Sequence, residues 1–195
     1  MKVLKVTVTK LQAARRQLET ALDLYFNEKD PVSIHALATA AYNVIRKVNR
    51  NKGGMPMLVK DTHAKQFAET TGKTEKEIAN ILNEAENFFK HADSDPNGTL
   101  TFDDGEAELF LFDAIGKYGE ITQEKVPIFA AFHWWFVSRH PYIVKPGFPD
   151  KVPPPGLVDA AKTMTRRQWF DVMMLALLGT GGNAVDTKGN GLAVP

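Results

Sequence analysis

The residues best suited to chemistry lie in one polar stretch, KHADSDPNGTLTFDD, over residues 90–104. An EF-hand calcium loop needs oxygen ligands at its first, third, fifth, seventh and twelfth positions and a glycine at the sixth, which permits a sharp turn. This stretch has Gly98 at the sixth position, and its ligand residues would be Asp93, Asp95, Asn97, Thr99 and Asp104. The spacing therefore predicts calcium as the one cofactor that the sequence suggests.

The same stretch also fits a plain connector between two helices. Asp-Pro-Asn-Gly is common in turns, because proline presets φ and Asn-Gly accepts positive φ. The twelfth position carries Asp104 instead of the longer Glu, and the chain has only one such loop, whereas EF-hands usually work in pairs. We take the connector as the leading interpretation and calcium binding as the alternative.

The helix predicted before this stretch carries a second group of candidates. Asn80, Glu84, Asn87 and His91 recur every three or four residues and so share one helix face. His91 could act as an acid or base, with Asn87 or Lys90 holding a phosphate group. A solvated helix face gives the same pattern. The catalytic candidates are therefore His91, Asn87 and Lys90. We nevertheless do not expect this protein to be an enzyme.

Composition excludes several classes of protein. Of the 195 residues, 44% are hydrophobic and 24% charged, as in ordinary folded domains. The net charge of +1 indicates no general attraction to nucleic acid or to an anionic membrane. There is no cysteine, which excludes disulfides and cysteine-ligated zinc, and the most apolar run, VPIFAAFHWWFV, is too short to span a bilayer. We expect a soluble, cytoplasmic protein.

Hydrophobic periodicity predicts an all-α fold, a bundle of five or six main helices. The helix starts are marked by capping boxes at Thr9–Gln12 and Thr74–Glu77, and by Asp30 before Pro31. We assign the bundle to residues 1–139, where the alternating residues 3–8 could form a short strand. These helices must position the polar candidates.

The character of the chain changes at residue 140. The segment PYIVKPGFPDKVPPPG has too many prolines for a helix interior and predicts an extended, Pro-rich linker. A helix over about residues 166–179 should then dock on the bundle, followed by a Gly-rich tail that we expect to be mobile. Arg166 and Arg167 begin that helix, where the helix dipole disfavours positive charge, so either an acidic partner or solvent exposure is needed to explain them.

Two resemblances add to this interpretation. The segments KLQAARRQLETALDLYF, DPVSIHALATAAYNVI and NFFKHADSDP together resemble a family of uncharacterised bacterial helical proteins, over roughly residues 9–140. This resemblance implies a soluble helical fold and supplies no catalytic residue. The first helical hairpin, with ALATAAYNVI, distantly resembles HEPN domains, bacterial helical bundles of toxins and phage defence. HEPN domains that cut RNA carry an Arg, a polar residue and a His within a turn or two; the nearest equivalent here is Asn87 to His91, with Lys90 in place of the Arg.

Three hypotheses about function follow. The favoured one is a non-enzymatic bundle that binds an unknown protein partner or forms a homo-oligomer, through the aromatic helix and the C-terminal extension. The second is a HEPN-like protein that binds or cleaves RNA, with His91 as acid or base. The third is a calcium-binding protein that uses the loop over residues 93–104.

Overall fold

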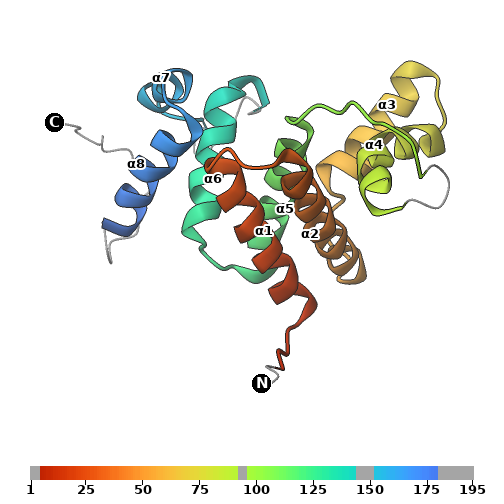
Figure 1. Cartoon of the computed structure of the whole chain (residues 1–195), viewed down its shortest axis with the longest axis horizontal. Helices are drawn as coiled ribbons and strands as arrows, with labels where there is room; N and C mark the ends of the chain where they lie inside the picture. The colour runs from red at the N-terminus through yellow and green to blue at the C-terminus, as the bar shows by residue number, and fades with distance from the viewer. Residues whose placement is uncertain (1–4, 92–95, 144–151, 180–195) are drawn as a thin grey trace. The chain divides into compact units, whose positions relative to one another are not determined.

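The computed structural model of the protein describes residues 5–91, 96–143 and 152–179, and every element in these ranges is helical. The predicted all-α fold class is therefore confirmed. Figure 1 shows the arrangement of the elements. In chain order they are α1 (Lys10–Phe26), α2 (Pro31–Asn51), the π-helical turn η1 (Leu58–His63), α3 (Ala64–Thr71), α4 (Glu75–Lys90), α5 (Glu106–Thr122), α6 (Pro127–Arg139), the 3-10 turn η2 (Pro141–Ile143), α7 (Pro155–Thr163) and α8 (Arg166–Gly179).

The chain divides into two compact units, residues 1–125 and residues 126–195. The sequence analysis placed the boundary after residue 139. In the structure the boundary lies before α6, and the aromatic helix groups with the C-terminal residues. The reason is that α6 packs against α7 and α8. An apolar helix is a natural centre for a small unit, because both neighbours can bury their apolar sides against it.

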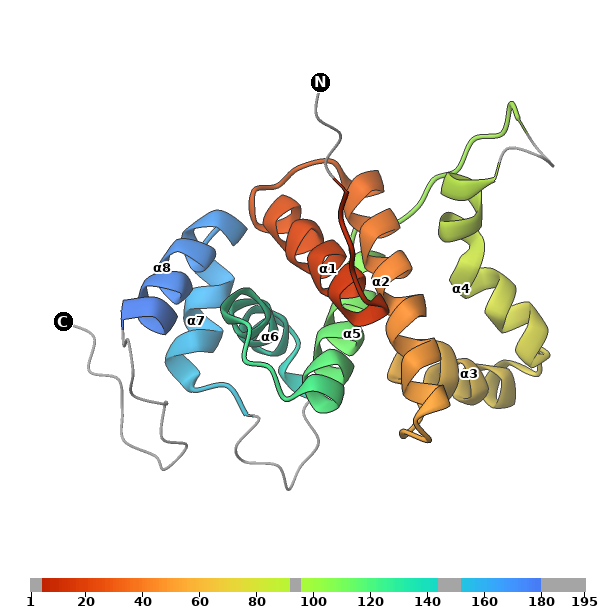
Figure 2. The same cartoon turned by 90° about the horizontal axis from the view of Figure 1, so that it is seen from below.

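The first unit is built on a hairpin of α1 and α2, which lie side by side in both views (Figures 1 and 2). Thr9 and Gln12 form the predicted capping box at the start of α1. The side chain of Asp30 accepts a hydrogen bond of 2.8 Å from the Ser33 amide, and Pro31 occupies the first turn of α2. These local signals explain why the connection is short and the helices antiparallel.

α5 closes the core of the first unit by packing on α2. Its apolar side chains meet those of the hairpin; Tyr42 and Phe110, for example, make an edge-to-face contact with ring centroids 5.2 Å apart. Burying each large apolar side chain stabilises the fold by about 1.5–3 kcal/mol. The core residues with almost no exposed surface include Leu18, Leu22, Tyr25, Phe26, Tyr42, Ile45, Leu111 and Tyr118.

A second pair of helices, α3 and α4, extends the first unit. α3 ends at Gly72, whose φ of +70° lies in the left-handed region that favours glycine. Thr74 and Glu77 then form the predicted capping box that starts α4. α4 contacts both α3 and α2, which brings its polar side chains next to those of the hairpin.

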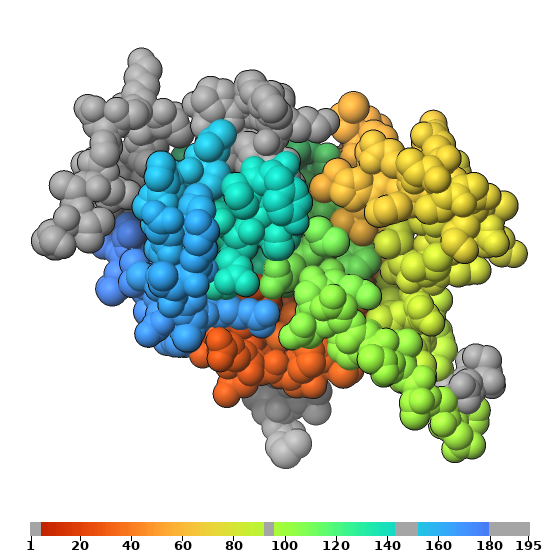
Figure 3. All heavy atoms as spheres, turned by 90° about the horizontal axis from the view of Figure 1, so that it is seen from above, coloured from red at the N-terminus to blue at the C-terminus, as the bar shows by residue number. Residues whose placement is uncertain are grey.

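The second unit forms around α6. Phe129, Phe132, Trp135 and Phe136 are buried, so most of the aromatic helix is core and not an exposed binding surface. Figure 3 shows α7 alongside α6. α7 was not predicted from the sequence, because the prolines in this region indicated an extended linker. Pro155 stands in the first turn of the helix, where a proline is tolerated.

α8 covers the residues predicted for the C-terminal helix. It docks through Trp169, which is 1% exposed and donates a hydrogen bond of 3.0 Å from Nε1 to the Ala131 carbonyl of α6. The Trp135 and Trp169 rings meet at a centroid distance of 5.5 Å. Trp169 therefore supplies both an apolar contact and a hydrogen bond that orient α8 on α6.

The short strand suggested for residues 3–8 is wrong over its described part, because residues 5–8 form no strand. A lone strand has no partner for its backbone groups, and none of the described residues provides one. Residues 3 and 4 lie outside the described residues, as do much of the predicted linker and the Gly-rich tail after residue 179.

Replacing Trp169 by alanine should detach α8 from α6. We expect a loss of about 3–5 kcal/mol in the free energy of unfolding of the second unit, because a large aromatic side chain is removed from a buried site. Thermal and urea unfolding followed by far-UV circular dichroism would measure it. Trp169→Phe keeps a ring there and should lose clearly less. An unchanged midpoint in Trp169→Ala would show that α8 is not held by this contact.

Candidate functional site

The polar row predicted on α4 lines an open groove of about 830 Å³. Asn80, Glu84, Asn87 and His91 all contribute, so helical spacing brought these residues together as expected. Ile81 and Phe88 of α4 line it too, together with Thr99 and Leu100. Ile81 is 54% exposed, so part of the groove wall is apolar.

The catalytic candidates do not form a phosphate-holding group in this groove. His91 is exposed and ends α4, with its backbone N–H donating to the Asn87 carbonyl. Lys90 instead points to Glu86, at 2.6 Å from Nζ to Oε1. Among the described residues that line the groove there is no lysine or arginine. RNA binding or cleavage with His91 stays a prediction.

The calcium loop is only partly described. Asp93 and Asp95 lie outside the described residues, whereas Asn97, Thr99 and Asp104 are exposed. In the described part of the chain no three His, Asp or Glu side chains gather where they could hold a metal ion. The loop ends in a local turn, in which Asp103 Oδ1 accepts a hydrogen bond of 2.8 Å from the Gly105 amide. Calcium binding stays a prediction.

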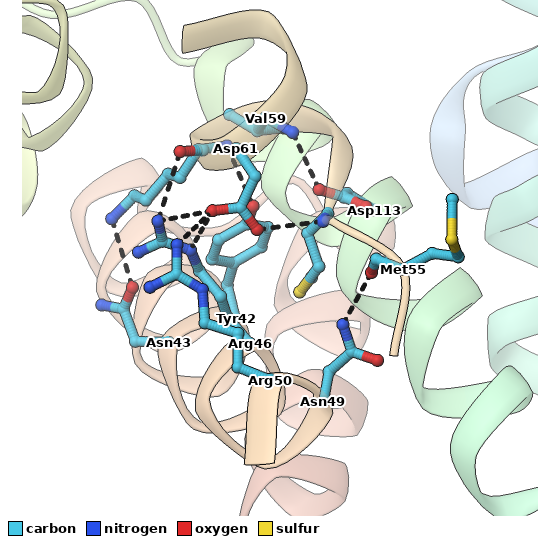
Figure 4. Close-up of polar contacts among 11 residues, drawn as sticks. Tyr42, Asn43, Arg46, Asn49, Arg50, Met55, Val59, Asp61 and Asp113 are labelled. Carbon is cyan, nitrogen blue, oxygen red and sulfur yellow. Dashed lines mark hydrogen bonds and ion pairs between the residues drawn. The ribbon is translucent and has the colours of Figure 1, made fainter. Parts of the chain in front are cut away.

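A polar cluster that the sequence did not reveal lies between α2 and the π-helical turn (Figure 4). Its centre is Asp61, whose Oδ1 accepts hydrogen bonds from two arginines of α2. The distances are 2.9 and 2.6 Å from Nε and Nη2 of Arg46 and 2.5 Å from Nη2 of Arg50. Asp61 Oδ2 accepts from the Met57 amide at 3.0 Å. Arg46 and Arg50 stand one helical turn apart, which lets both reach one carboxylate.

Asp61 is charged in the folded protein. Burial alone would raise its pKa, but hydrogen bonds from Arg46, the Met57 amide and Arg50 outweigh that effect and hold the pKa below its usual range. The side chain of Asp61 is 11% exposed, so these partners replace water. Asp61 therefore serves as a charged tie between the π-helical turn and α2.

A second buried carboxylate, Glu86 of α4, joins α4 to the same cluster. Lys60 Nζ lies 2.7 Å from its Oε2 and Lys90 Nζ 2.6 Å from its Oε1, while Asn43 of α2 donates a hydrogen bond of 2.6 Å. Burial would raise the pKa of Glu86, but the hydrogen bonds from Lys60 and Lys90 lower it. Burial lowers the pKa of Lys60, whose side chain is only 6% exposed.

The amides at the start of the π-helical turn are capped by side chains of other elements. Asp113 of α5 accepts a hydrogen bond of 2.9 Å from the Val59 amide, and the Tyr42 hydroxyl accepts one of 3.0 Å from the Lys60 amide. Burial raises the pKa of Asp113 and of Tyr42. π-Helical turns are rare and occur often at functional sites. This one is held by α2 and α5 together.

The loop before the turn explains the glycine pair in NRNKGGMPM. Gly53 has a φ of +69°, and a Cβ on Gly54 would lie 1.9 Å from Asn49 Oδ1, so neither position accommodates a side chain easily. Asn49 also donates a hydrogen bond of 2.8 Å from Nδ2 to the Met55 carbonyl. The glycines were visible in the sequence, but nothing in their spacing indicated that Asp61 would fold back onto Arg46 and Arg50.

His35 of α2 is a buried histidine that makes no hydrogen bond to any described residue. It is 1% exposed and surrounded by the rings of Phe89, Phe102 and Phe110, at centroid distances of 5.5, 5.9 and 5.8 Å. Its Nε2 lies 3.9 Å from Glu106 Oε2, too far for a hydrogen bond. Burial lowers the pKa of His35 and raises that of Glu106.

The second unit offers a candidate surface on α8. Trp169 and Met173 are buried on one side of the helix, whereas Val172, Leu175 and Leu178 on another side are 50%, 74% and 59% exposed. Three large apolar side chains on one short helix form an exposed patch of the kind that marks protein–protein contacts. We call these three residues the α8 face.

Replacing Asp61 by alanine should destabilise the first unit by about 3–5 kcal/mol, because Arg46 and the Met57 amide lose a mostly buried partner. Urea unfolding at neutral pH would measure it. Asp171→Ala is the matched control, since Asp171 pairs with Arg167 while half exposed, and its loss should cost about 1 kcal/mol or less. Equal effects of the two substitutions would contradict a structural role for Asp61.

Acid should destabilise the protein through His35. Its folded pKa lies below the ordinary 6.5, so the unfolded state binds the proton more readily and stability falls as pH drops below about 6.5. The change in melting temperature between about pH 7.5 and about pH 5.5 should be smaller in His35→Phe, which suits the aromatic surroundings. Glu106→Gln, which removes the neighbouring carboxylate, is the control. An undiminished acid effect in His35→Phe would assign it to other groups.

No helix of the described residues is both long and apolar enough to cross a membrane. Comparisons with protein-family models, with curated proteins and with solved structures found no match to this chain. The likeness to the uncharacterised bacterial family and to HEPN domains stays a prediction, and the function has to be argued from the sites described above.

Proposed function

We propose that this is a non-enzymatic protein of the cytoplasm that assembles with a second copy of itself through the α8 face. The observation that carries the proposal is the exposure of Val172, Leu175 and Leu178 on a helix whose other side is docked on α6. Burying such side chains is worth about 1.5–3 kcal/mol each.

A second copy is the partner that fits this helix best, in an antiparallel pair of α8 helices. Such a pair is self-complementary about a twofold axis. Leu175 of each copy would lie near the axis, and Val172 of one copy would face Leu178 of the other. The α8 face would thus be covered by an identical face, without any second type of surface.

Charge supports the antiparallel orientation. The first turn of α8 carries Arg166 and Arg167 and no acidic residue, and the last turn carries no basic residue. Within one copy this arrangement opposes the helix dipole, which is positive at the N-terminus. In an antiparallel pair the arginines of each copy lie toward the negative C-terminal end of the other. An arrangement that is unfavourable in one helix becomes favourable between two.

The perturbed carboxylates of the first unit favour a structural role over catalysis. Asp61 and Glu86 are the kind of shifted, buried groups that often mark active sites. Here each accepts hydrogen bonds from two basic side chains, and Asp61 also accepts from a backbone amide. Their acceptor oxygens are thus used in holding elements together.

Sedimentation velocity or light scattering over a range of protein concentrations tests the proposal. The protein should form dimers, and Leu175→Glu should weaken dimerisation by about a hundredfold or more, because two carboxylates would meet at the centre of an apolar contact. Ile81→Glu is the matched control, since Ile81 is similarly exposed on α4 and should leave the dimer unchanged.

Other outcomes would overturn the proposal. A protein that stays monomeric at all concentrations has no self-association to explain. A dimer that Leu175→Glu leaves intact and Ile81→Glu disrupts would move the contact to the α4 groove. Circular dichroism of both variants would verify that they are folded.

A further inference from the structure

A pocket of about 410 Å³ opens beside the Asp61 cluster of the first unit. Its volume is in the range typical of small-molecule sites. Four basic residues line it, Arg46, Arg50, Lys60 and Lys65, together with the two acidic residues Asp61 and Glu75. The remaining wall is made of small residues, which leaves room for a ligand between the charged groups.

The two arginines have donors left for a ligand. Arg46 uses Nε and Nη2 on Asp61 and the Lys60 carbonyl, and Arg50 uses Nη2 on Asp61. A guanidinium has five N–H donors. Within the described residues no acceptor is found for Nη1 of Arg46 or for Nε and Nη1 of Arg50. Asp61 thus holds both guanidinium groups in place, and some N–H donors of each remain without an acceptor among the described residues.

The charges around the pocket do not balance. Asp61 pairs with two arginines, and Glu86, which does not line the pocket, pairs with Lys60 and Lys90. Each carboxylate therefore neutralises only one of its two cations. Lys65 is exposed and pairs with no described residue. The lining itself carries two more basic than acidic residues. A ligand with two negative charges would restore neutrality.

We propose that this pocket binds a phosphate group, as inorganic phosphate or as the phosphate of a small phosphomonoester. The paired N–H donors of an arginine side chain match the oxygens of a phosphate better than the single ammonium group of a lysine does. The first turns of α4 contribute Glu75 and Ala79 to the wall, so this helix end supplies one of the two acidic residues already counted. The site is independent of the α8 face, since all its residues lie in the first unit.

Isothermal titration calorimetry at matched ionic strength tests the site, with inorganic phosphate and with a nucleoside monophosphate as probes. Arg50→Gln and Lys65→Gln should each weaken binding about tenfold, the factor expected for one charge-assisted hydrogen bond. Lys47→Gln is the matched control, because Lys47 is exposed on the same helix outside the pocket. Lys65 holds no described partner, so its variant should fold normally.

Each outcome decides the matter. Saturable binding that the two pocket variants weaken and Lys47→Gln does not would support the site. Tighter binding of the monophosphate would make the natural ligand an ester, equal binding would assign the affinity to the phosphate group alone, and weaker binding would favour inorganic phosphate. No saturation at about 10 mM of either probe, a concentration at which even a millimolar site is mostly filled, would overturn the proposal. So would equal weakening by Lys47→Gln.

Discussion

The carboxylate of Asp61 is the interaction that fixes the position of the π-helical turn in the first unit. It accepts hydrogen bonds from Arg46, Arg50 and the Met57 amide at once, and so fastens the π-helical turn to α2. A charge taken out of water is costly unless its partners replace the solvent, and here three do. Because α3 follows the turn directly, the position of this carboxylate also fixes where the next helix starts.

Glu86 extends the same arrangement to α4, so that a polar seam runs from α2 through the π-helical turn to the second helical pair. The apolar core between α1, α2 and α5 supplies most of the stabilisation, but apolar contacts are non-directional. Buried ion pairs add little net free energy, yet breaking one leaves an uncompensated charge. We therefore expect the seam to specify how the elements are oriented more than how stable they are.

The residues that stabilise each unit lie beside the binding sites proposed above. Arg46 and Arg50 are held by Asp61, and both arginines line the pocket. In the second unit Trp169 docks α8 on α6, and this leaves Leu175 exposed on another side of the helix. A side chain that is already held in place loses less conformational entropy when a ligand binds, so a rigid scaffold of this kind is preorganised for binding.

The sequence by itself determined the features that depend on neighbours three or four residues apart. The capping boxes at Thr9 and Thr74, the cap at Asp30, the bounds of α8 and the polar row on α4 were all predictable, since helical periodicity and N-caps are local. Only the tertiary structure decided that Asp61 meets two arginines, that His35 is buried among phenylalanines, and that the aromatic helix is core. Those outcomes join residues from different elements, and their free energy depends on burial and on partners that chain spacing does not specify.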